Sequence, residues 1–413
     1  MKLFVSVLEY SANIHLRHLL MELLKYQNIE ICGIFDEKIL DSTQKDFDNV
    51  SCDFNANSDA YVRSDLSNRA NSISGKSICN IEKVAVMGFI DVFKRIRFFI
   101  NLNKECLNLA LNADKILLMD SSSFNIPLAK RIKKRNPNKK IIYYILPQVW
   151  AWKPWRAKAL EANCDKLAAI LPFEVESYTK KAEFAGHPLL DEIIYFKNAK
   201  HSDFINNTNG KNNVCDKSNK TSDSTQKEHI FSFMPGSRKA EIERIFPVFI
   251  EVKNHLKAHN ANAIFHLIIP QKFKGRNLED IYKNLNDFII SFDAHKSLFH
   301  SKFAFICSGT ATLECALIGT PFVLGYKCRA IEAFIARQFL RIKFIGLANL
   351  LYEKIKPNEI FHTELLQNDL NVKNLINAFE SANESDFLAK SLLLRKYLKN
   401  GSAKVVAKWL YDL

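Results

Sequence analysis

The chain has 413 residues with a formal net charge of +14, and 47% of the residues are hydrophobic. This composition excludes an intrinsically disordered chain, and the length is sufficient for two domains with separate cores. Nine scattered cysteines without a C-x-x-C pair argue against a disulfide framework and a zinc site, and they suit a reducing cytoplasm.

Apolar runs that predict buried strands alternate with amphipathic helical stretches along most of the chain. Strands are predicted at 3–8, 29–35, 115–119, 141–146, 167–171, 229–234, 264–269, 303–307 and 321–324, and helices at 14–25, 92–111 and 312–317. The first run is too short for a signal peptide, and no run approaches the ~18 residues that span a bilayer. Continuous apolar strands between helices predict an α/β fold with parallel sheets covered on both faces.

Two polar stretches interrupt this alternation. Residues 198–227 are nearly free of apolar side chains, so we expect a linker or insertion between two α/β halves. Residues 41–80 are interpreted as a long insertion in the first half. Two doubly wound domains imply a cleft between them, and such sheets bind ligands at the carboxyl ends of their strands.

The turn after the predicted strand at 229–234 reads Pro235-Gly236-Ser237-Arg238, and a predicted helix follows with Glu241 in its first turn. Such a turn aims backbone N–H groups, a helix dipole and a guanidinium at one point, where a diphosphate could bind. The alternative is that Gly236 only makes the turn and Ser237 only caps the helix.

A second turn of this kind follows the predicted strand at 303–307. Ser308 and Thr310 offer hydroxyls, and Gly309 lets the backbone approach a ligand closely. Glu314 could accept the hydroxyls of a ribose. The alternative is a plain helix cap with Glu314 as a solvated acid. Two such turns in one half favour a nucleotide diphosphate as the ligand.

In the first half, the predicted strand at 115–119 ends at Asp120-Ser-Ser-Ser-Phe-Asn125. A carboxylate at a strand end could act as general base toward a hydroxyl, although Asp also commonly caps the next helix or turn. His187 follows a short predicted strand at the end of this half, where the cleft is expected.

Aromatic and basic residues concentrate in Leu146-Pro-Gln-Val-Trp-Ala-Trp-Lys-Pro-Trp155 and the following Arg156 and Lys158. Gln148 and the indoles could line an acceptor site, or the Trp rings could pack on a neighbouring helix. Residues 87–100 mix large apolar and basic side chains. They could lie on an anionic membrane surface or form an ordinary half-buried helix.

Two patterns that suggest metal binding carry little weight. Asp46-Phe-Asp48 matches the D-x-D of metal-dependent sugar transferases, but it lies in the polar stretch rather than after a strand. His255 and His259 are spaced i, i+4, but no Glu follows the first His as in H-E-x-x-H. We therefore predict no metal site and no cofactor.

The motifs together resemble one family, the lipid-A-disaccharide synthases, which are inverting glycosyltransferases of the GT-B architecture. The matching blocks follow the family order over roughly residues 1–355. They are Ala85-Val-Met-Gly88, Asp120 with Phe124-Asn125, Pro147 with Val149-Trp-Ala-Trp152, Leu171-Pro-Phe-Glu174, Gly186-His187, Pro235-Gly-Ser-Arg238 with Glu241, Ser308-Gly-Thr-Ala311 with Leu313-Glu314, Gly325-Tyr326 and Asn349-Leu-Leu351.

The resemblance implies two Rossmann-like, doubly wound domains that face a central cleft. Residues 1–197 would bind the acceptor, and residues 228–385 would bind the UDP-sugar. The segment 386–413, with a helix predicted at 392–410, would pack back on the first domain. The sequence leaves open whether the chain forms a homodimer.

The resemblance also implies a reaction. Diacylglucosamine would pass from UDP-2,3-diacylglucosamine to 2,3-diacylglucosamine 1-phosphate, giving a β-1,6-linked tetraacyl disaccharide 1-phosphate and UDP without a metal, in lipid A (lipopolysaccharide) biosynthesis. Such substrates imply a cytoplasmic, Gram-negative enzyme that associates peripherally with inner-membrane lipids and does not bind nucleic acid.

By motif match, Asp120 resembles the catalytic carboxylate, and Arg238 resembles the residue that meets the diphosphate. The UDP-sugar site would comprise Gly236, Ser237, Arg238, Glu241, Ser308, Gly309, Thr310, Glu314 and Asn349. The acceptor side of the cleft would comprise Glu9, Ser11, Gln148, Trp150, Trp152 and His187. The chain departs from the family's Gly-Glu-Ala-Ser-Gly-Asp at Leu8-Glu-Tyr-Ser-Ala-Asn13, and Asp120 is the only carboxylate left in its loop.

Two other readings of the sequence stay open. A related GT-B enzyme on another UDP-sugar, such as a UDP-N-acetylglucosamine epimerase, would share the nucleotide turns but would not need the Val149-Trp-Ala-Trp152 block. A non-catalytic protein that binds a membrane surface or nucleic acid would account for the charge of +14 and the Trp cluster. No RNA-binding motif or basic low-complexity tail accompanies that charge.

Overall fold

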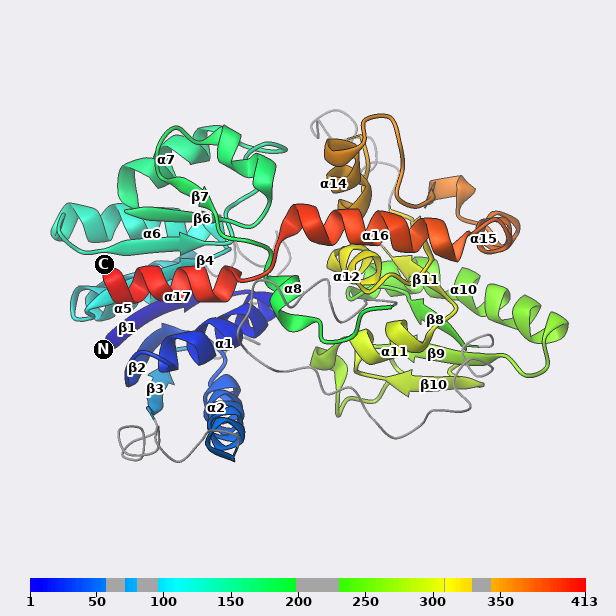
Figure 1. Cartoon of the computed structure of the whole chain (residues 1–413), viewed down its shortest axis with the longest axis horizontal. Coiled ribbons are helices and arrows are strands. Elements are labelled where there is room, and N and C mark those ends of the chain that lie inside the picture. Colours follow the sequence, from blue (N-terminus) through cyan, green and yellow to red (C-terminus); the bar gives the residue numbers. More distant parts are fainter. Residues whose placement is uncertain (57–70, 80–95, 198–229, 308, 329–342) are drawn as a thin grey trace. The chain divides into compact units, whose positions relative to one another are not determined.

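The computed structural model describes residues 1–56, 71–79, 96–197, 230–307, 309–328 and 343–413. These residues form two compact units, one of Met1–Glu192 with Leu398–Leu413 and the other of Ile193–Tyr397. Each unit has a parallel β-sheet with helices on both faces (Figure 1). The sequence predicted this α/β architecture. The polar segment 198–227 and the block at 85–88 lie outside the described residues.

The sheet of the first unit has the strand order β3-β2-β1-β4-β5-β6-β7, and all neighbours are parallel. Its strands are β1 Lys2–Val7, β2 Ile29–Ile34, β3 Ile73–Ser77, β4 Lys115–Met119, β5 Ile141–Tyr144, β6 Lys166–Ala169 and β7 Ala182–Phe184. Its helices are α1 Tyr10–Leu24, α2 Lys38–Ala56, α5 Ile96–Leu111, α6 Ser122–Arg135, α7 Trp155–Asn163, the 3₁₀ helix η1 Pro172–Ser177, α8 Pro188–Glu192 and α17 Ser402–Asp412. The order reverses between β1 and β4, which makes that pair the topological switch point.

The sheet of the second unit has the order β10-β9-β8-β11-β12-β13, again parallel throughout. Its strands are β8 Ile230–Met234, β9 Ile264–Ile268, β10 Phe288–Ser291, β11 Phe303–Cys307, β12 Phe322–Tyr326 and β13 Glu364–Leu366. Its helices are α10 Lys239–His259, η3 Gln271–Phe273, α11 Ala294–His300, α12 Thr310–Ile318, α14 Leu347–Ile355, η4 Gln367–Asp369, α15 Val372–Glu380 and α16 Glu384–Leu398. Here the switch point lies between β8 and β11.

Continuous apolar strands form because both faces of each sheet are buried. In β5 all four residues are buried, and alternate side chains enter different cores. Ile141 and Tyr143 pack with α5 and α6, whereas Ile142 and Tyr144 pack with α1 and α17. The pleat sends neighbours to opposite faces, so a strand between two helical layers needs apolar residues at every position.

The prediction that residues 41–80 are only a polar insertion was wrong for part of that stretch. Residues 38–56 form α2, and residues 73–77 form the edge strand β3 beside β2. A Cβ on Gly75 would lie 2.1 Å from the carbonyl oxygen of Ile31, so this position requires glycine. A short, polar edge strand lacks the apolar run by which the central strands were found.

The single helix predicted at 392–410 is two helices, α16 and α17. Lys399 and Gly401 between them have φ angles of +53° and +94°, which lie outside the helical region. The helix α17 packs against α1, and the hydroxyl of Tyr144 is 2.7 Å from that of Ser402. Within the helices that the structure describes, none combines the length and the hydropathy that a membrane span requires.

Candidate active site

The two turns predicted to bind a diphosphate lie side by side in the second unit. One follows β8 and the other follows β11, the two strands that flank the switch point, and Ile306 pairs with Met234. A Cβ on Gly236 would lie 3.2 Å from the Sγ of Cys307 at the end of β11. Both turns therefore lie at the carboxyl edge, where doubly wound sheets bind ligands.

Gly236 is required by its backbone and by its surroundings. Its φ is +113°, and a Cβ would lie 2.8 Å from Oε2 of Glu241. That oxygen accepts hydrogen bonds from the backbone N–H groups of Ser237 and Arg238, each at 3.2 Å. Glu241 thus caps α10 from within, and it occupies two of the N–H groups that the sequence assigned to a diphosphate.

The Arg238 side chain is 79% exposed, and its Nη1 lies 3.0 Å from Oε1 of Glu241. The guanidinium therefore extends into solvent. Since a guanidinium has five N–H donors, one bond to Glu241 leaves donors for an anion.

The second turn leaves space for a ligand at Gly309. Its φ is +139°, and an added Cβ would meet nothing within 4 Å. Thr310, the first residue of α12, is exposed, and Glu314 is half-buried. Ser308 lies outside the described residues. An open backbone at a helix N-terminus is a suitable place for a phosphate.

Asn349 lies in α14, and its carboxamide is occupied by the protein. Its Nδ2 donates to the carbonyl of His362 at 3.0 Å and to Oε1 of Glu364 at 2.9 Å. Its Oδ1 accepts from the N–H groups of Phe361 and His362, at 2.7 and 3.0 Å. Glu364 in turn caps α14 through the N–H groups of 345 and 346. The structure therefore uses Asn349 as a brace rather than as an open binding group.

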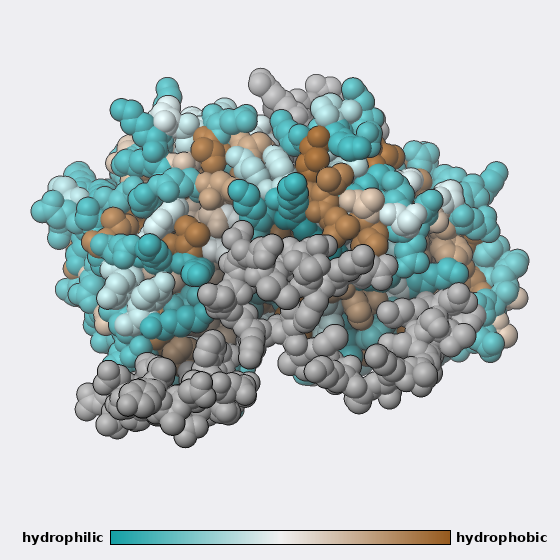
Figure 2. All heavy atoms as spheres, viewed as in Figure 1, coloured by the Kyte–Doolittle hydropathy of each residue, from teal (hydrophilic) through white to brown (hydrophobic). Residues whose placement is uncertain are grey.

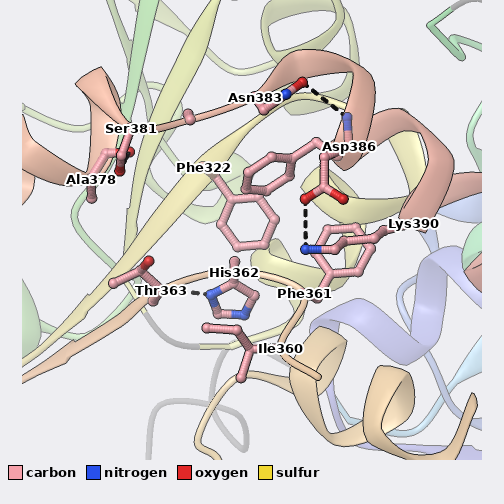
Figure 3. A pocket seen from close by; sticks show the side chains of 12 residues that line it. Phe322, Ile360, Phe361, His362, Thr363, Ala378, Ser381, Asn383, Asp386 and Lys390 are labelled. Carbon is pink, nitrogen blue, oxygen red and sulfur yellow. Dashed lines mark hydrogen bonds and ion pairs between the residues drawn. The ribbon is translucent and has the colours of Figure 1, made fainter. Parts of the chain in front are cut away.

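A pocket of about 150 Å³ lies at the opposite, amino edge of the second sheet. Phe322 begins β12 and Thr363 precedes β13, so the pocket is remote from the turns after β8 and β11. Figure 3 shows His362 between the ring of Phe322 and Ile360, with the ion pair of Asp386 and Lys390 beside them. This pocket is not the predicted diphosphate site.

In the first unit, Asp120 follows β4 at the switch point. Asp120 and Ser121 have φ angles of +48° and +37°, a left-handed conformation that is costly for residues other than glycine. Asn125 holds this turn, because its Nδ2 donates to the carbonyls of Met119 and Asp120 at 2.9 and 3.1 Å. Its Oδ1 accepts from the hydroxyl of Ser6 at 2.6 Å. The strain is held by a buried network, as is typical of functional turns.

The environment of Asp120 suits a proton acceptor. Burial raises the pKa of its carboxyl, and the N–H of Ser121 and the charge of His15 lower it. A carboxylate that is partly desolvated is a stronger base than one in water.

The aromatic segment contacts the Asp120 turn. Nη1 of Arg156 donates to the hydroxyl of Ser122 at 2.7 Å. Trp150 is half-buried against Phe173, and its Nε1 lies 3.4 Å from Oε1 of Glu174. Gln148 and Trp152 are exposed beside it. The predicted acceptor residues 148–152 are thus brought to the same edge of the sheet as Asp120.

The chain's departure from the family pattern after β1 has a structural role. Asn13 is buried, its Nδ2 donates to the carbonyl of Glu9 at 2.8 Å, and its Oδ1 accepts from the N–H of Asp36. An Asp could not donate to that carbonyl. Glu9 and Ser11 are exposed at the start of α1.

His187 is buried rather than open to a ligand. Its ring Nδ1 accepts a hydrogen bond from the backbone N–H of Leu189 at 3.3 Å, and the backbone N–H of His187 donates to the carbonyl of Lys399. Burial lowers the pKa of its ring to about 3. Its contacts make it a structural histidine that joins α8 to the chain before α17.

Sequence reasoning did not single out Asn125, His15 or Glu192 as site residues. Asn125 lies in one of the motifs that match the family, but its hydrogen bonds to Ser6 and to the Asp120 turn could be recognised only in the folded structure. His15 and Glu192 are 177 positions apart and carry no local pattern. Within the described part of the chain, no three His, Cys, Asp or Glu side chains form a group that could hold a metal ion.

Two doubly wound sheets with polar turns at both switch points define the GT-B class of glycosyltransferases. The structures of S. aureus MnaA with UDP and of the glycosyltransferase SnogD from Streptomyces nogalater are similar in fold, with TM-scores of 0.55 and 0.52 at 12% identity each. The alignments cover 100% of this chain and 97% and 99% of those chains.

The model of the family described as lipid-A-disaccharide synthetase matches residues 67–407. A lipid-A-disaccharide synthase from Helicobacter pylori (strain Shi470) is 43% identical over 98% of this chain and 96% of its own length. The chain belongs to the lipid-A-disaccharide synthase family.

Proposed function

We propose that the chain transfers diacylglucosamine from UDP-2,3-diacylglucosamine to 2,3-diacylglucosamine 1-phosphate, with inversion and without a metal. The products would be the β-1,6-linked disaccharide 1-phosphate and UDP. The observation that carries this proposal is Asp120, a half-buried carboxylate on a strained turn at the switch point of a family member. A strained and braced carboxylate at that place suits a general base.

On the acceptor side, Asp120 would take the proton from the sugar hydroxyl as the oxygen attacks the anomeric carbon of the donor. The exposed Gln148 and Trp152 and the half-buried Trp150 lie on the segment that contacts this turn and would line the acceptor. Arg156 donates one hydrogen bond to Ser122 and keeps other N–H donors, with which it would meet the acceptor phosphate.

On the donor side, UDP would leave from the turns after β8 and β11. Arg238, whose side chain is 79% exposed, would stabilise the charge on the departing diphosphate. Gly309 and Thr310 would offer backbone N–H groups at the N-terminus of α12. Glu241 and Asn349 would act by holding these segments, since their polar atoms bond to the protein.

The acylated substrates would bring this protein to a membrane surface. Exposed apolar side chains occur in two segments, Phe98 and Ile100 on α5, and Trp152 and Trp155 around the start of α7. Each segment also carries basic residues, Arg97 and Lys104 in the first and Lys153 and Lys158 in the second. Elsewhere, hydrophilic residues dominate the visible surface of each unit, with small hydrophobic patches between them (Figure 2). Aromatic and basic side chains together favour an anionic interface.

Vesicle sedimentation tests this membrane surface. The double variant Trp152→Ser/Trp155→Ser should bind anionic vesicles more weakly than the wild type. Ile289→Ser is the matched control, because Ile289 is 55% exposed in the second unit. Equal binding by all three proteins would contradict the proposed membrane-binding surface.

A homodimer remains a prediction, and light scattering would measure the oligomeric state.

The decisive experiment gives the purified protein both substrates in the presence of a chelator. We expect disaccharide and UDP to form, Asp120→Asn to lose turnover while it still binds UDP, and Arg238→Ala to lose activity. No product from the wild type would exclude this function, and product only with added divalent metal would exclude the metal-free mechanism. An epimerase, the alternative on this fold, would instead convert UDP-N-acetylglucosamine without an acceptor.

A further inference from the structure

A largely buried pair of side chains, His15 and Glu192, lies at the same edge of the first sheet as Asp120 and has no part in the mechanism described above. Nδ1 of His15, in the second turn of α1, contacts Oε1 of Glu192 at the end of α8. The two side chains are only 14% and 6% exposed. A hydrogen-bonded pair in such a place fixes the orientation and the tautomer of the imidazole.

Glu192 is held by its neighbour in α8. The carboxylate of Asp191 accepts from the N–H of Gly401 at 2.5 Å, the hydroxyl of Ser402 at 2.7 Å and the N–H of Ala403 at 3.1 Å. These bonds tie α8 to the N-terminus of α17, which itself packs on α1. The helix α8, which carries Glu192, is therefore anchored to α17.

His15 and Asp120 lie at the same edge of the first sheet. β1 and β4 are neighbours with Val7 paired to Met119, so α1 begins beside the turn that carries Asp120. Burial, the larger effect, raises the pKa of the Asp120 carboxyl, whereas the charge of His15 lowers it. A charge acting across a partly desolvated site is weakly screened.

Other titratable groups surround the two residues. Tyr143 of β5 interacts with Asp120, and burial raises the pKa of that phenol far above its usual value. His18 of α1 interacts with His15 and Glu192, and burial lowers the pKa of its ring. His187 interacts with His15, and its own pKa of about 3 keeps it neutral. These groups are neutral near pH 7, so they do not replace the charge of His15.

We propose that His15, held by Glu192, is a positioning residue whose positive charge keeps Asp120 in its proton-accepting form. The inference rests on the proposed function, in which Asp120 is the base. In the transfer step the acceptor hydroxyl gives its proton to Asp120, its oxygen bonds to the anomeric carbon, and the bond to the UDP oxygen breaks. His15 exchanges no proton in this step and acts through its charge.

The experiment measures kcat/KM against pH for His15→Gln and Glu192→Gln in the full-length protein. Both variants should shift the acidic limb toward higher pH, because Asp120 then ionises less readily. We expect about a tenfold loss at the acidic end for His15→Gln, which corresponds to about one pH unit, and near-normal rates on the alkaline plateau. Glu192→Gln should shift the limb in the same direction by less.

His255→Gln on α10 of the second unit is the matched control and should leave the profile unchanged. A loss that is equal at every pH, or no change at all, would overturn the proposal and leave the pair with a structural role. If His15→Gln does not fold, the kcat/KM profile of Glu192→Gln tests the proposal instead, because that variant keeps the imidazole of His15. Full turnover by Asp120→Asn would instead overturn the proposed function itself, regardless of how the acidic limb of the kcat/KM profile shifts in the His15 and Glu192 variants.

Discussion

At the scale of single residues, the site depends on a few positions that admit one type of side chain. Gly236 lies where a Cβ would meet the capping carboxylate of Glu241, so the turn after β8 could not close around another residue. Asn125 bonds to Ser6 and to two carbonyls of the Asp120 turn. Both residues fix the backbone of their turns, and the backbone in turn fixes where the functional side chains beside them lie.

Gly236→Ala should lower stability by about 1–3 kcal/mol and weaken UDP binding, because the methyl group meets Glu241 at a positive φ. Gly275→Ala is the matched control, since Gly275 also has a positive φ of +81° but nothing within 4 Å of its Cβ. Urea unfolding and titration with UDP measure the two effects. If both variants lose the same stability, the contact with Glu241 has no importance.

Glu174 gives the first unit a pH dependence. Burial raises the pKa of its carboxyl to about 7, from an ordinary value of 4.5, although the N–H groups of Leu171 and Trp150 oppose the shift. Below pH 4.5 the group is protonated in both states. Between pH 4.5 and about 7 the unfolded state ionises while the folded state keeps the proton, so the free energy of unfolding falls by about 3 kcal/mol, and this stability is lost once the pH has passed 7. Glu174→Gln should abolish this loss between pH 4.5 and 7 in urea unfolding, and an unchanged slope would contradict the assignment.

At the scale of elements, helix termini carry much of the organisation. α10 and α14 are capped by Glu241 and Glu364, and the C-terminal carbonyls of α12 bond to Ser391 and Arg395 of α16. α17 is capped from another helix by Asp191. Each contact satisfies groups that a helix end leaves open, and each fixes one element relative to another.

Asp191→Ala should release α17 from the first unit. The carboxylate accepts three hydrogen bonds at that N-terminus, so we expect a loss of about 2–3 kcal/mol. Hydrogen exchange should accelerate in residues 402–412 and less in β4 and β5. Asp412→Ala at the far end of the same helix is the control. Uniform protection in both variants would show that apolar packing on α1 alone holds the helix.

At the scale of the whole molecule, each compact unit carries its own buried neutral histidine. Burial lowers the pKa of His187 to about 3 in the first unit and that of His362 to about 4 in the second. An unfolded histidine takes up a proton near pH 6.5, so stability that is present above that pH is lost as the pH falls toward these values. The linkage corresponds to about 3–5 kcal/mol for each unit.

Acid unfolding should therefore be separable by unit. All four Trp lie in the first unit, so their fluorescence follows that unit, whereas far-UV circular dichroism follows both. His187→Asn should make the fluorescence transition less sensitive between pH 6.5 and 4, because Oδ1 can still accept from Leu189. His362→Gln should change only the circular dichroism. If His362→Gln also moves the fluorescence transition, the units do not unfold independently.

The sequence by itself determined the α/β class, the central strands and the polar turns. Apolar runs at 115–119 and 303–307 match β4 and β11 to the residue, because a strand buried on both faces must be apolar throughout. Short edge strands such as β3, β10 and β13 lack that signal, since one side of each is open.

Only the tertiary structure decided how side chains share their bonds. It showed that the polar side-chain atoms of Glu241 and Asn349 form hydrogen bonds within the protein, and that His187 is buried. It also brought His15 to Glu192, a contact between helices far apart in sequence. Local pattern reports which residues are available, but hydrogen bonds and charges act over distances in space that only the packed fold defines.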